Sequence, residues 1–482
     1  MSKTEPSRGE KTRLSQSPKS GATPRRQRVI RFRGLSQRRS RPFPIALQLV
    51  VGLIVLITIG TALLMIPGAG TRKLSFIEAF FTATSASAVT GLSLFPISTD
   101  LTIWGQLALL LLVQIGGVGL IVAVAMVFRL IGRQVTLGER LAVTSSLGLD
   151  RPEEIASIMV RAIGLMLAIE GIGAIALFLH WRISGIVPAG KAAYYAVFHA
   201  VTAYCNAGFD LFYGLPEYPN GIPTDPLSLI ILGGLIILGG LGIPIYMDLI
   251  YRHRRRQLTL HTRLTIVISI VLILIGWIGL LLSEYRQTGV LSTMPFGQRA
   301  ILAWFQSVSA RTAGFPGLPG FTEINHPSIL MLTALMFIGT APASTGGGIT
   351  TGTFAVLWLA LISYARGLDK IRIGKHTLPG ALLMRAMVVF VISFSLVILA
   401  TWLILLTNPF TLDQTLFEVV SAYSTTGLSL GITTGLNTIG RLIIIFTMFA
   451  GRLGAITIMI ALLGRETGKK LVDYPEESIL IG

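Results

Sequence analysis

Four glycines recur along this chain of 482 residues at nearly equal intervals, each at the end of a short run of small residues. They are Gly91, Gly208, Gly314 and Gly427, and the intervals are 117, 106 and 113 residues. Glycine lacks Cβ and can turn its carbonyls in directions closed to other residues, and carbonyl oxygens can replace the hydration shell of an alkali cation. A single glycine of this kind is ordinarily a turn, but four in matching context predict a cation site built from four copies of one unit.

Each glycine and the two residues before it are the predicted selectivity filter. The residue directly before each glycine is Thr or Ala, small enough for four loops to meet at one axis. The predicted filter residues are Val89, Thr90 and Gly91; Asn206, Ala207 and Gly208; Thr312, Ala313 and Gly314; and Thr425, Thr426 and Gly427.

A short, partly apolar segment precedes each signature and is predicted to be a helix. A helix of this length reaches about 20 Å, whereas the hydrocarbon core of a bilayer is about 30 Å thick, so the chain must enter and return on the outer side. A non-helical return is tolerated there only if it is buried in protein or lines a water-filled path. Four such returns would enclose a pore, and the negative C-terminal ends of the helices would favour a cation. The segments are 75–87, 190–203, 297–309 and 412–423.

The composition indicates that these elements lie in a membrane. Hydrophobic residues make up 52% of the chain, charged residues only 13%, and the mean hydropathy is +0.72, whereas soluble proteins carry about 25% charged residues. One cysteine excludes a disulfide framework. Eight segments are apolar enough to span the bilayer, and they cover about 45–66, 103–130, 160–182, 228–250, 264–283, 328–365, 379–406 and 438–463.

Together these segments predict an all-α integral membrane protein with eight transmembrane helices and four re-entrant pore helices. Span, pore helix, filter loop and span repeat four times around a pseudo-fourfold pore. The predicted repeats cover residues 44–130, 131–252, 253–366 and 367–464, and a disordered basic tail (1–43) and a C-terminal tail (465–482) flank them.

The net charge of +18 lies mostly in the N-terminal tail, where thirteen Lys/Arg and two Glu give +11. This location argues against a nucleic-acid-binding face and fits the positive-inside rule. The loops after the fourth, sixth and eighth spans are also basic, so both termini are expected in the cytoplasm. The expected location is the plasma (inner) membrane, where the tail can bind anionic lipid. The acids Asp100, Asp210 and Asp225 are expected outside, where they raise the local cation concentration weakly.

The predicted sixth span is interrupted at residues 339–350 by Pro342 and three consecutive glycines. So much unpaired backbone at membrane depth requires a wet cavity. The interruption is therefore predicted to be a mobile gate under the filter, and a hinge or a packing notch is the alternative. The predicted gate residues are Thr345, Gly346, Gly347 and Gly348.

Two of the ionisable residues inside predicted spans are candidates for a functional role. An intramembrane Arg costs about 2.5–3.5 kcal/mol on insertion scales, so Arg452 is predicted to hold the gate shut through carbonyls of the broken span or to place a positive charge beside the pore. A purely structural bond to the backbone is the alternative. Glu170 could be a ligand for a coupling ion, but a buried partner for an Arg or a helix end is the favoured interpretation.

Several motifs resemble those of the Trk/Ktr/HKT superfamily of potassium transporters, and most closely its KtrB/TrkH-type pore subunits. The resemblance implies a potassium-translocating pore subunit, with Na⁺ as a second permeant or modulating ion and no cofactor in this chain. It also implies a homodimer and a separate cytoplasmic ring, KtrA-like or TrkA-like, that binds the regulatory nucleotide. The motifs are Gln114–Gly119, Gly239–Gly242, the broken span Gly339–Thr350, Gly451–Gly454 and the tail Tyr474–Gly482.

Two other classes of function compete with a pore. A sodium- or proton-coupled secondary cation symporter expects inverted repeats and a carboxylate at the membrane midplane, whereas these repeats run in one direction and Glu170 stands alone. A membrane-embedded enzyme expects clustered polar groups at one depth. The polar residues gather instead at four loops, so the sequence predicts a transporter and no enzyme.

Overall fold

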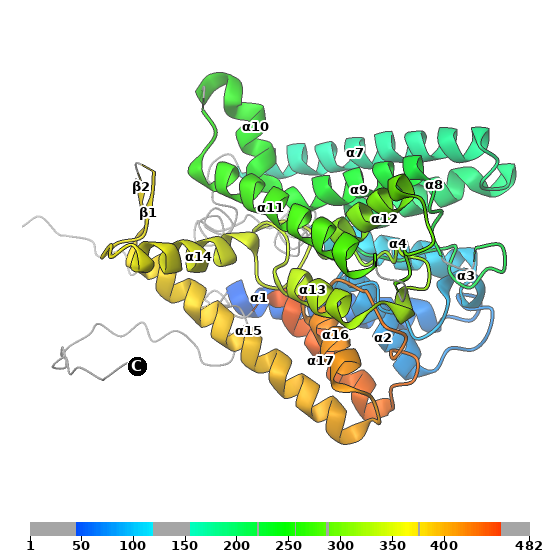
Figure 1. The fold of residues 1–482 in the computed structure, drawn as a ribbon. Coiled ribbons are helices and arrows are strands. Elements are labelled where there is room, and N and C mark those ends of the chain that lie inside the picture. Colours follow the sequence, from blue (N-terminus) through cyan, green and yellow to red (C-terminus); the bar gives the residue numbers. More distant parts are fainter. Residues whose placement is uncertain are drawn as a thin grey trace, which may run out of the picture. The chain divides into compact units, whose positions relative to one another are not determined.

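The computed structural model describes residues 45–118, 155–218, 221–255, 257–285, 289–374 and 376–454. Both predicted tails, and the later parts of the predicted second and eighth spans, lie outside these residues. Within them the chain is helical, apart from one antiparallel pair of two-residue strands, β1 (Arg372–Ile373) and β2 (His376–Thr377). Figure 1 shows these elements along the chain.

Among the residues that the structure describes, four helices are long and apolar enough to cross a membrane, with mean hydropathy of 2.2–2.8 over their most apolar windows. Only 22–28% of the residues in those windows are buried inside the protein. A helix that is apolar on all faces and mostly exposed is stable in a lipid bilayer, whereas its apolar surface would be unfavourable in water. The prediction of an all-helical membrane protein is therefore confirmed at this level, and the four helices are α1 (Ile45–Met65), α7 (Ile155–Ile183), α11 (Leu260–Ser283) and α15 (Gly380–Thr407).

Four shorter helices follow these spans, within one or two residues of the predicted pore helices. Two begin at a capping box, in which the Ser75 or Thr411 side chain and the Glu or Gln three residues later satisfy free backbone N–H groups. The other two begin after Pro188 and Pro295, whose extended backbone precedes the first turn. The helices are α2 (Phe76–Ser87), α8 (Ala189–Tyr204), α12 (Phe296–Ser309) and α16 (Leu412–Tyr423).

The helices after the glycine loops are shorter or broken. In the part of the chain that the structure describes, one long helix follows the first loop and one follows the fourth, whereas the second and third loops lead into two helices each. The short α3 (Ile97–Asp100) and the 3₁₀ turn η2 (Phe321–Glu323) lie between loop and helix. The helices are α4 (Ile103–Gly117); α9 (Pro226–Leu241) and α10 (Ile243–Arg255); α13 (His326–Phe337) and α14 (Thr351–Ala365); and α17 (Thr438–Leu453).

The predicted fourth span, 228–250, is not one straight helix. The axes of α9 and α10 meet at 90°, because Gly242 at the junction has φ 83° and ψ 154°, outside the helical region. Two backbone bonds hold the junction against the interrupted sixth span: Ile243 N donates to Ala343 O and Ala341 N donates to Gly240 O. Gly242 and the nearby Pro244 were the local signal of the bend.

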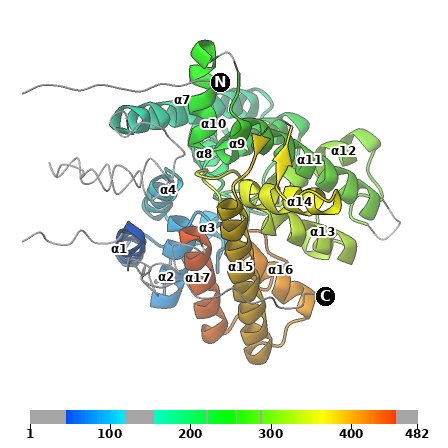
Figure 2. The ribbon, with the colours of Figure 1, turned by 90° about the vertical axis from the view of Figure 1, so that its left-hand side faces the viewer.

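Each pore helix packs against its own unit and against one helix of the preceding unit. α8 contacts α4, α12 contacts α9, α16 contacts α13, and α2 contacts α17. These pairings close a cycle in chain order, so the first and fourth units are neighbours. Figure 2 shows the same order, with the colours running from blue through green and yellow to orange around the view.

Candidate ion pathway

The four predicted filter loops meet in a closed ring. A Cβ atom built on any of the loop glycines would collide with the carbonyl oxygen of the residue before the next unit's glycine, at separations that real Cβ atoms do not show. Only glycine fits where four backbones approach so closely. The collisions are Gly91 with Ala207 O at 2.4 Å, Gly208 with Ala313 O at 2.7 Å, Gly314 with Thr426 O at 2.1 Å, and Gly427 with Thr90 O at 2.1 Å.

The residue two positions before each glycine is held in a strained backbone conformation. Val89, Asn206, Thr312 and Thr425 have φ between 51° and 69°. A left-handed conformation is rare for a non-glycine residue and an outlier for a β-branched one, and such strain gathers at functional sites. Sequence reasoning assigned the unusual backbone to the glycines alone, because nothing in a Val or Thr signals a positive φ.

The backbone N–H groups of the loops point back into their own pore helices. Thr90 N donates to Ser85 O (2.7 Å), Ala207 N to Thr202 O (2.8 Å), and Thr426 N to Ser421 O (2.8 Å). Among the described residues, no hydrogen bond is accepted by the carbonyls of the twelve predicted filter residues. Their oxygens are therefore available to a cation, as a carbonyl filter requires.

Three further glycines let the second helix of a unit approach the end of its pore helix. A Cβ on Gly116, Gly239 or Gly451 would lie 2.4, 1.7 or 1.8 Å from the carbonyl oxygen of Ser87, Tyr204 or Tyr423, respectively. Each of these carbonyls belongs to the residue four positions before a loop glycine. The glycine-rich motifs in these helices are thus explained by close packing beneath the filter.

We expect Gly239→Ala to destabilise the protein strongly, since its Cβ would overlap backbone that cannot move without displacing the second loop. Overpacking of a rigid site costs about 1–3 kcal/mol or more. Gly234→Ala on the same helix is the matched control, because a Cβ there meets no atom within 4 Å. Thermal unfolding of the two purified variants checks this, and equal midpoints would contradict the packing role.

Two of the predicted gate residues, Gly346 and Gly347, lie directly against the third and fourth filter loops. A Cβ on Gly346 would lie 2.1 Å from Thr312 Oγ1, and one on Gly347 would lie 2.6 Å from Thr425 Oγ1. The loop runs between α13 and α14, and Thr345 Oγ1 donates to Gly239 O (3.2 Å). The structure thus brings the predicted gate and filter together.

Arg452 reaches two carbonyls that are far apart in the sequence. Its Nη1 donates to Thr345 O in the interrupted span, as one of its predicted roles requires, and its Nη2 donates to Gly116 O at the end of α4. The second acceptor was not predicted. A cavity of about 320 Å³ lies beside the guanidinium, lined by Arg452 and by Thr345, Gly346, Gly347 and Gly348 among other residues.

A second buried arginine lies in the third filter loop. Arg311 is only 5% exposed, and its guanidinium donates to Gly339 O (3.1 Å) and Ser269 O (3.3 Å). It ties this loop to the start of the interrupted span. The available signal was its charge, since the equivalent residues three positions before the other loop glycines, Ala88, Cys205 and Ser424, are uncharged.

The partners of Glu170 among the described residues are Gln114 and Cys205, and not the arginine or helix end that the favoured interpretation expected. Its Oε2 accepts a hydrogen bond from Gln114 Nε2 (2.9 Å), and Oε1 lies 3.7 Å from the Cys205 thiol, directly behind the second filter loop. Within the described residues, no group of three His, Cys, Asp or Glu could hold a metal ion.

The three predicted external acids each have a partner. Asp100 accepts a hydrogen bond from Arg72 Nε (2.8 Å), Asp210 lies 3.0 Å from His199, and Asp225 lies 2.6 Å from His180. Arg72 shares its one positive charge between Asp100 and Glu78, and the expectation that the three acids raise the local cation concentration stays a prediction.

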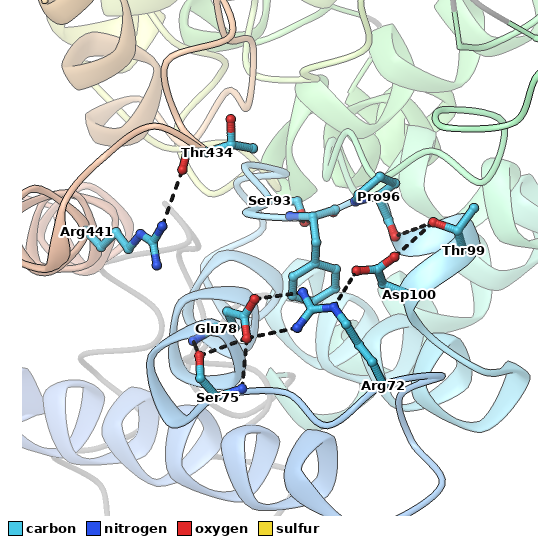
Figure 3. Close-up of polar contacts among 10 residues, drawn as sticks. Arg72, Ser75, Glu78, Ser93, Pro96, Thr99, Asp100, Thr434 and Arg441 are labelled. Carbon is cyan, nitrogen blue, oxygen red and sulfur yellow. Dashed lines mark hydrogen bonds and ion pairs between the residues drawn. The ribbon is translucent and has the colours of Figure 1, made fainter.

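Arg72 also binds Glu78, at the start of α2. Figure 3 shows its guanidinium between the two carboxylates; Nη2 lies 2.7 Å from Glu78 Oε1. The guanidinium carbon lies 5.4 Å from the centre of the Phe95 ring. The hydrogen bonds from Arg72 lower the pKa of Glu78 to about 2.

A lowered pKa in the folded state predicts a stability contribution that disappears in acid. Glu78 stabilises the fold fully above its unfolded pKa of 4.5, and the contribution is lost as the pH falls toward about 2. We expect the difference in unfolding temperature between the wild type and Glu78→Gln, which keeps the capping box, to shrink between pH 5 and 3. A difference that is constant with pH would contradict the ion pair.

The comparisons with known proteins agree with this geometry. A family model described as "TrkH: Cation transport protein" matches residues 44–468. The chain is 33% identical to the Ktr system potassium uptake protein B of Vibrio alginolyticus, over 87% of this chain and 91% of that protein. It is 31% identical to the potassium/sodium uptake protein NtpJ of Enterococcus hirae, over 92% and 98%.

A solved structure shares the fold. The potassium transporter TrkH from Vibrio parahaemolyticus matches with a TM-score of 0.68 at 19% sequence identity, and the match covers 88% of this chain and 86% of that one. At this identity the likeness establishes the arrangement of the helices and nothing finer.

Proposed function

Because the chain belongs to the TrkH family of cation transport proteins, we propose that it is the potassium-conducting pore subunit of a Ktr/Trk-type uptake system. The family is one of transporters, so the prediction that the protein is no enzyme is confirmed. The relatives named as potassium uptake proteins support K⁺ as the cargo, and the relative named as a potassium/sodium uptake protein supports Na⁺ as a second ion.

The observation that carries the proposal is the closed ring of four glycine loops with carbonyls free of protein partners. An ion that enters from outside loses water and gains carbonyl oxygens at this ring. The C-terminal ends of α2, α8, α12 and α16 add their negative partial charge behind it. We assign the twelve predicted filter residues to this site, in an architecture of eight spans and four re-entrant helices with the repeat boundaries given above.

The interrupted sixth span is the proposed gate below the filter. Gly346 and Gly347 lie against the third and fourth filter loops, and Thr345 and the three glycines after it border the cavity beside Arg452. Arg452 links this loop to the end of α4 and so holds the constriction in place. When these bonds break, the loop is free to leave the path of the ion.

The pore requires partners outside this chain. We infer a homodimer with one pore in each subunit, and a KtrA-like or TrkA-like cytoplasmic ring that carries the regulatory nucleotide, because the relatives are named as components of a Ktr system. The chain itself carries no cofactor in this proposal. Both termini face the cytoplasm, and the surrounding membrane is the plasma (inner) membrane.

Flux measurements in liposomes test the proposed function. Purified protein should admit K⁺ and Rb⁺ down their gradients, faster than Na⁺, and without an imposed Na⁺ or H⁺ gradient. Uptake that requires a fixed stoichiometry of Na⁺ or H⁺ would instead establish a coupled symporter. No flux of any alkali cation from folded protein, with or without a regulatory ring, would contradict the pore.

A further inference from the structure

The segment after the fourth loop glycine is tied back to its own pore helix by a buried carboxylate. Glu418, on α16, is fully buried, and its Oε2 accepts a hydrogen bond from Ser429 Oγ (2.7 Å). Its Oε1 accepts a hydrogen bond from Thr433 Oγ1. The carboxylate thus holds the segment that follows Gly427 at two residues, Ser429 and Thr433.

The second unit has a bonded pair at the same two positions. Glu418 and Ser429 lie nine residues before and two residues after Gly427. The equivalent residues around Gly208 are His199 and Asp210, whose Nε2 and Oδ1 atoms lie 3.0 Å apart. Both side chains are buried, and Asp210 also accepts a hydrogen bond from Phe212 N (2.7 Å).

In the third unit the pair is displaced by one residue. Phe305 and Pro316 occupy the two positions and form no polar pair, but Gln306 Oε1 accepts a hydrogen bond from Gly317 N (2.7 Å). The partners are again eleven residues apart. Three different chemical pairs thus link the same two segments, which indicates that the link itself matters rather than one side chain.

The first unit lacks the link. Thr82 and Ser93 occupy the two positions, but Thr82 Oγ1 is buried and has no hydrogen-bond partner among the described residues. Ser93 Oγ instead donates to Phe95 O (2.6 Å) within its own turn. Thr82 therefore serves as an internal control, because it occupies the position equivalent to Glu418 and forms no such link among the described residues.

We propose that Glu418, together with the His199–Asp210 pair, positions the filter and thereby sets its preference between K⁺ and Na⁺. The proposal rests on the proposed function, because it assigns a role at the same ring. The loop carbonyls face the ion, while these pairs anchor the chain on the far side of each glycine. If one of these links is lost, the loop relaxes. The difference in how well its carbonyls bind the larger K⁺ and the smaller Na⁺ then becomes smaller.

Substitutions at Glu418 and Thr82 test this role. Glu418→Met keeps the volume of the side chain but accepts no hydrogen bond from Ser429 or Thr433, and the K⁺/Na⁺ permeability ratio should fall about tenfold while K⁺ flux persists. Glu418→Gln retains an acceptor oxygen and should keep most of the ratio. Thr82→Val, at the equivalent position without a link, should leave the ratio unchanged.

Each outcome separates the positioning role from a structural one. An unchanged ratio in Glu418→Met, or an equal fall in Thr82→Val, would overturn the proposal while leaving the pore intact. If Glu418→Met does not fold, Ser429→Ala removes one hydroxyl of the same link from a less buried site, and its ratio decides instead. A wild type that does not conduct K⁺ would contradict the proposed function itself.

Discussion

Replacing Gly314 by serine is expected to abolish most of the discrimination between K⁺ and Na⁺. The added Cβ would lie 2.1 Å from the carbonyl oxygen of Thr426, so the third and fourth loops must separate or distort. If this backbone displacement changes the difference between the binding free energies of K⁺ and Na⁺ by only about 1.4 kcal/mol, selectivity changes tenfold. The measurement is the ratio of K⁺ to Na⁺ flux in liposomes.

Gly297→Ser is the control for this substitution. Gly297 lies at the start of α12, in the same unit as Gly314, and a Cβ there meets no atom within 4 Å. Its flux ratio should equal that of the wild type. An unchanged ratio in Gly314→Ser, in protein that is folded and active, would remove Gly314 from the filter.

Arg452→Gln is expected to raise K⁺ flux in the absence of any regulatory subunit. The substitution removes the charge-assisted hydrogen bonds to Thr345 O and Gly116 O, each worth about 1.5–3 kcal/mol. Loss of one such bond shifts a closed-to-open equilibrium about tenfold or more. We expect the basal flux to rise by that factor and to depend less on the regulatory ring.

Arg441→Gln on the same helix is the matched control. Arg441 lies near the start of α17, and its guanidinium donates to Thr434 O (3.3 Å), as Figure 3 shows. Among the described residues, its side-chain hydrogen bond goes to Thr434 and not to the interrupted span or α4, so the basal flux of Arg441→Gln should match that of the wild type. Basal flux that vanishes in folded Arg452→Gln would show that the arginine supports conduction rather than closure.

The elements that could be predicted from the sequence are those with a local or repeated signal. The segments predicted as pore helices match observed helices within two residues, because a short, partly apolar segment precedes each glycine signature. The glycine ring was predicted from four matching signatures. The interruption at 339–350 was predicted from a run of small residues that no apolar helix would contain.

Other features depend on contacts that a sequence pattern does not encode. Hydropathy reports that residues 228–250 are apolar but not that the chain turns by 90° at Gly242. The partners of Asp100 and Glu170 lie 28 and 56 residues away. The second acceptor of Arg452 is 336 residues away, so only the folded chain brings the two together.

The ring of loops comes from one polypeptide, and this has an evolutionary consequence. In an assembly of identical subunits, a change in one codon alters every quadrant of the conduction path at once, so small adjustments are not available. Here each quadrant is encoded by its own stretch of sequence, and among the described residues the first shows none of the polar links found in the other three. Natural selection can therefore retune ion preference one quarter at a time.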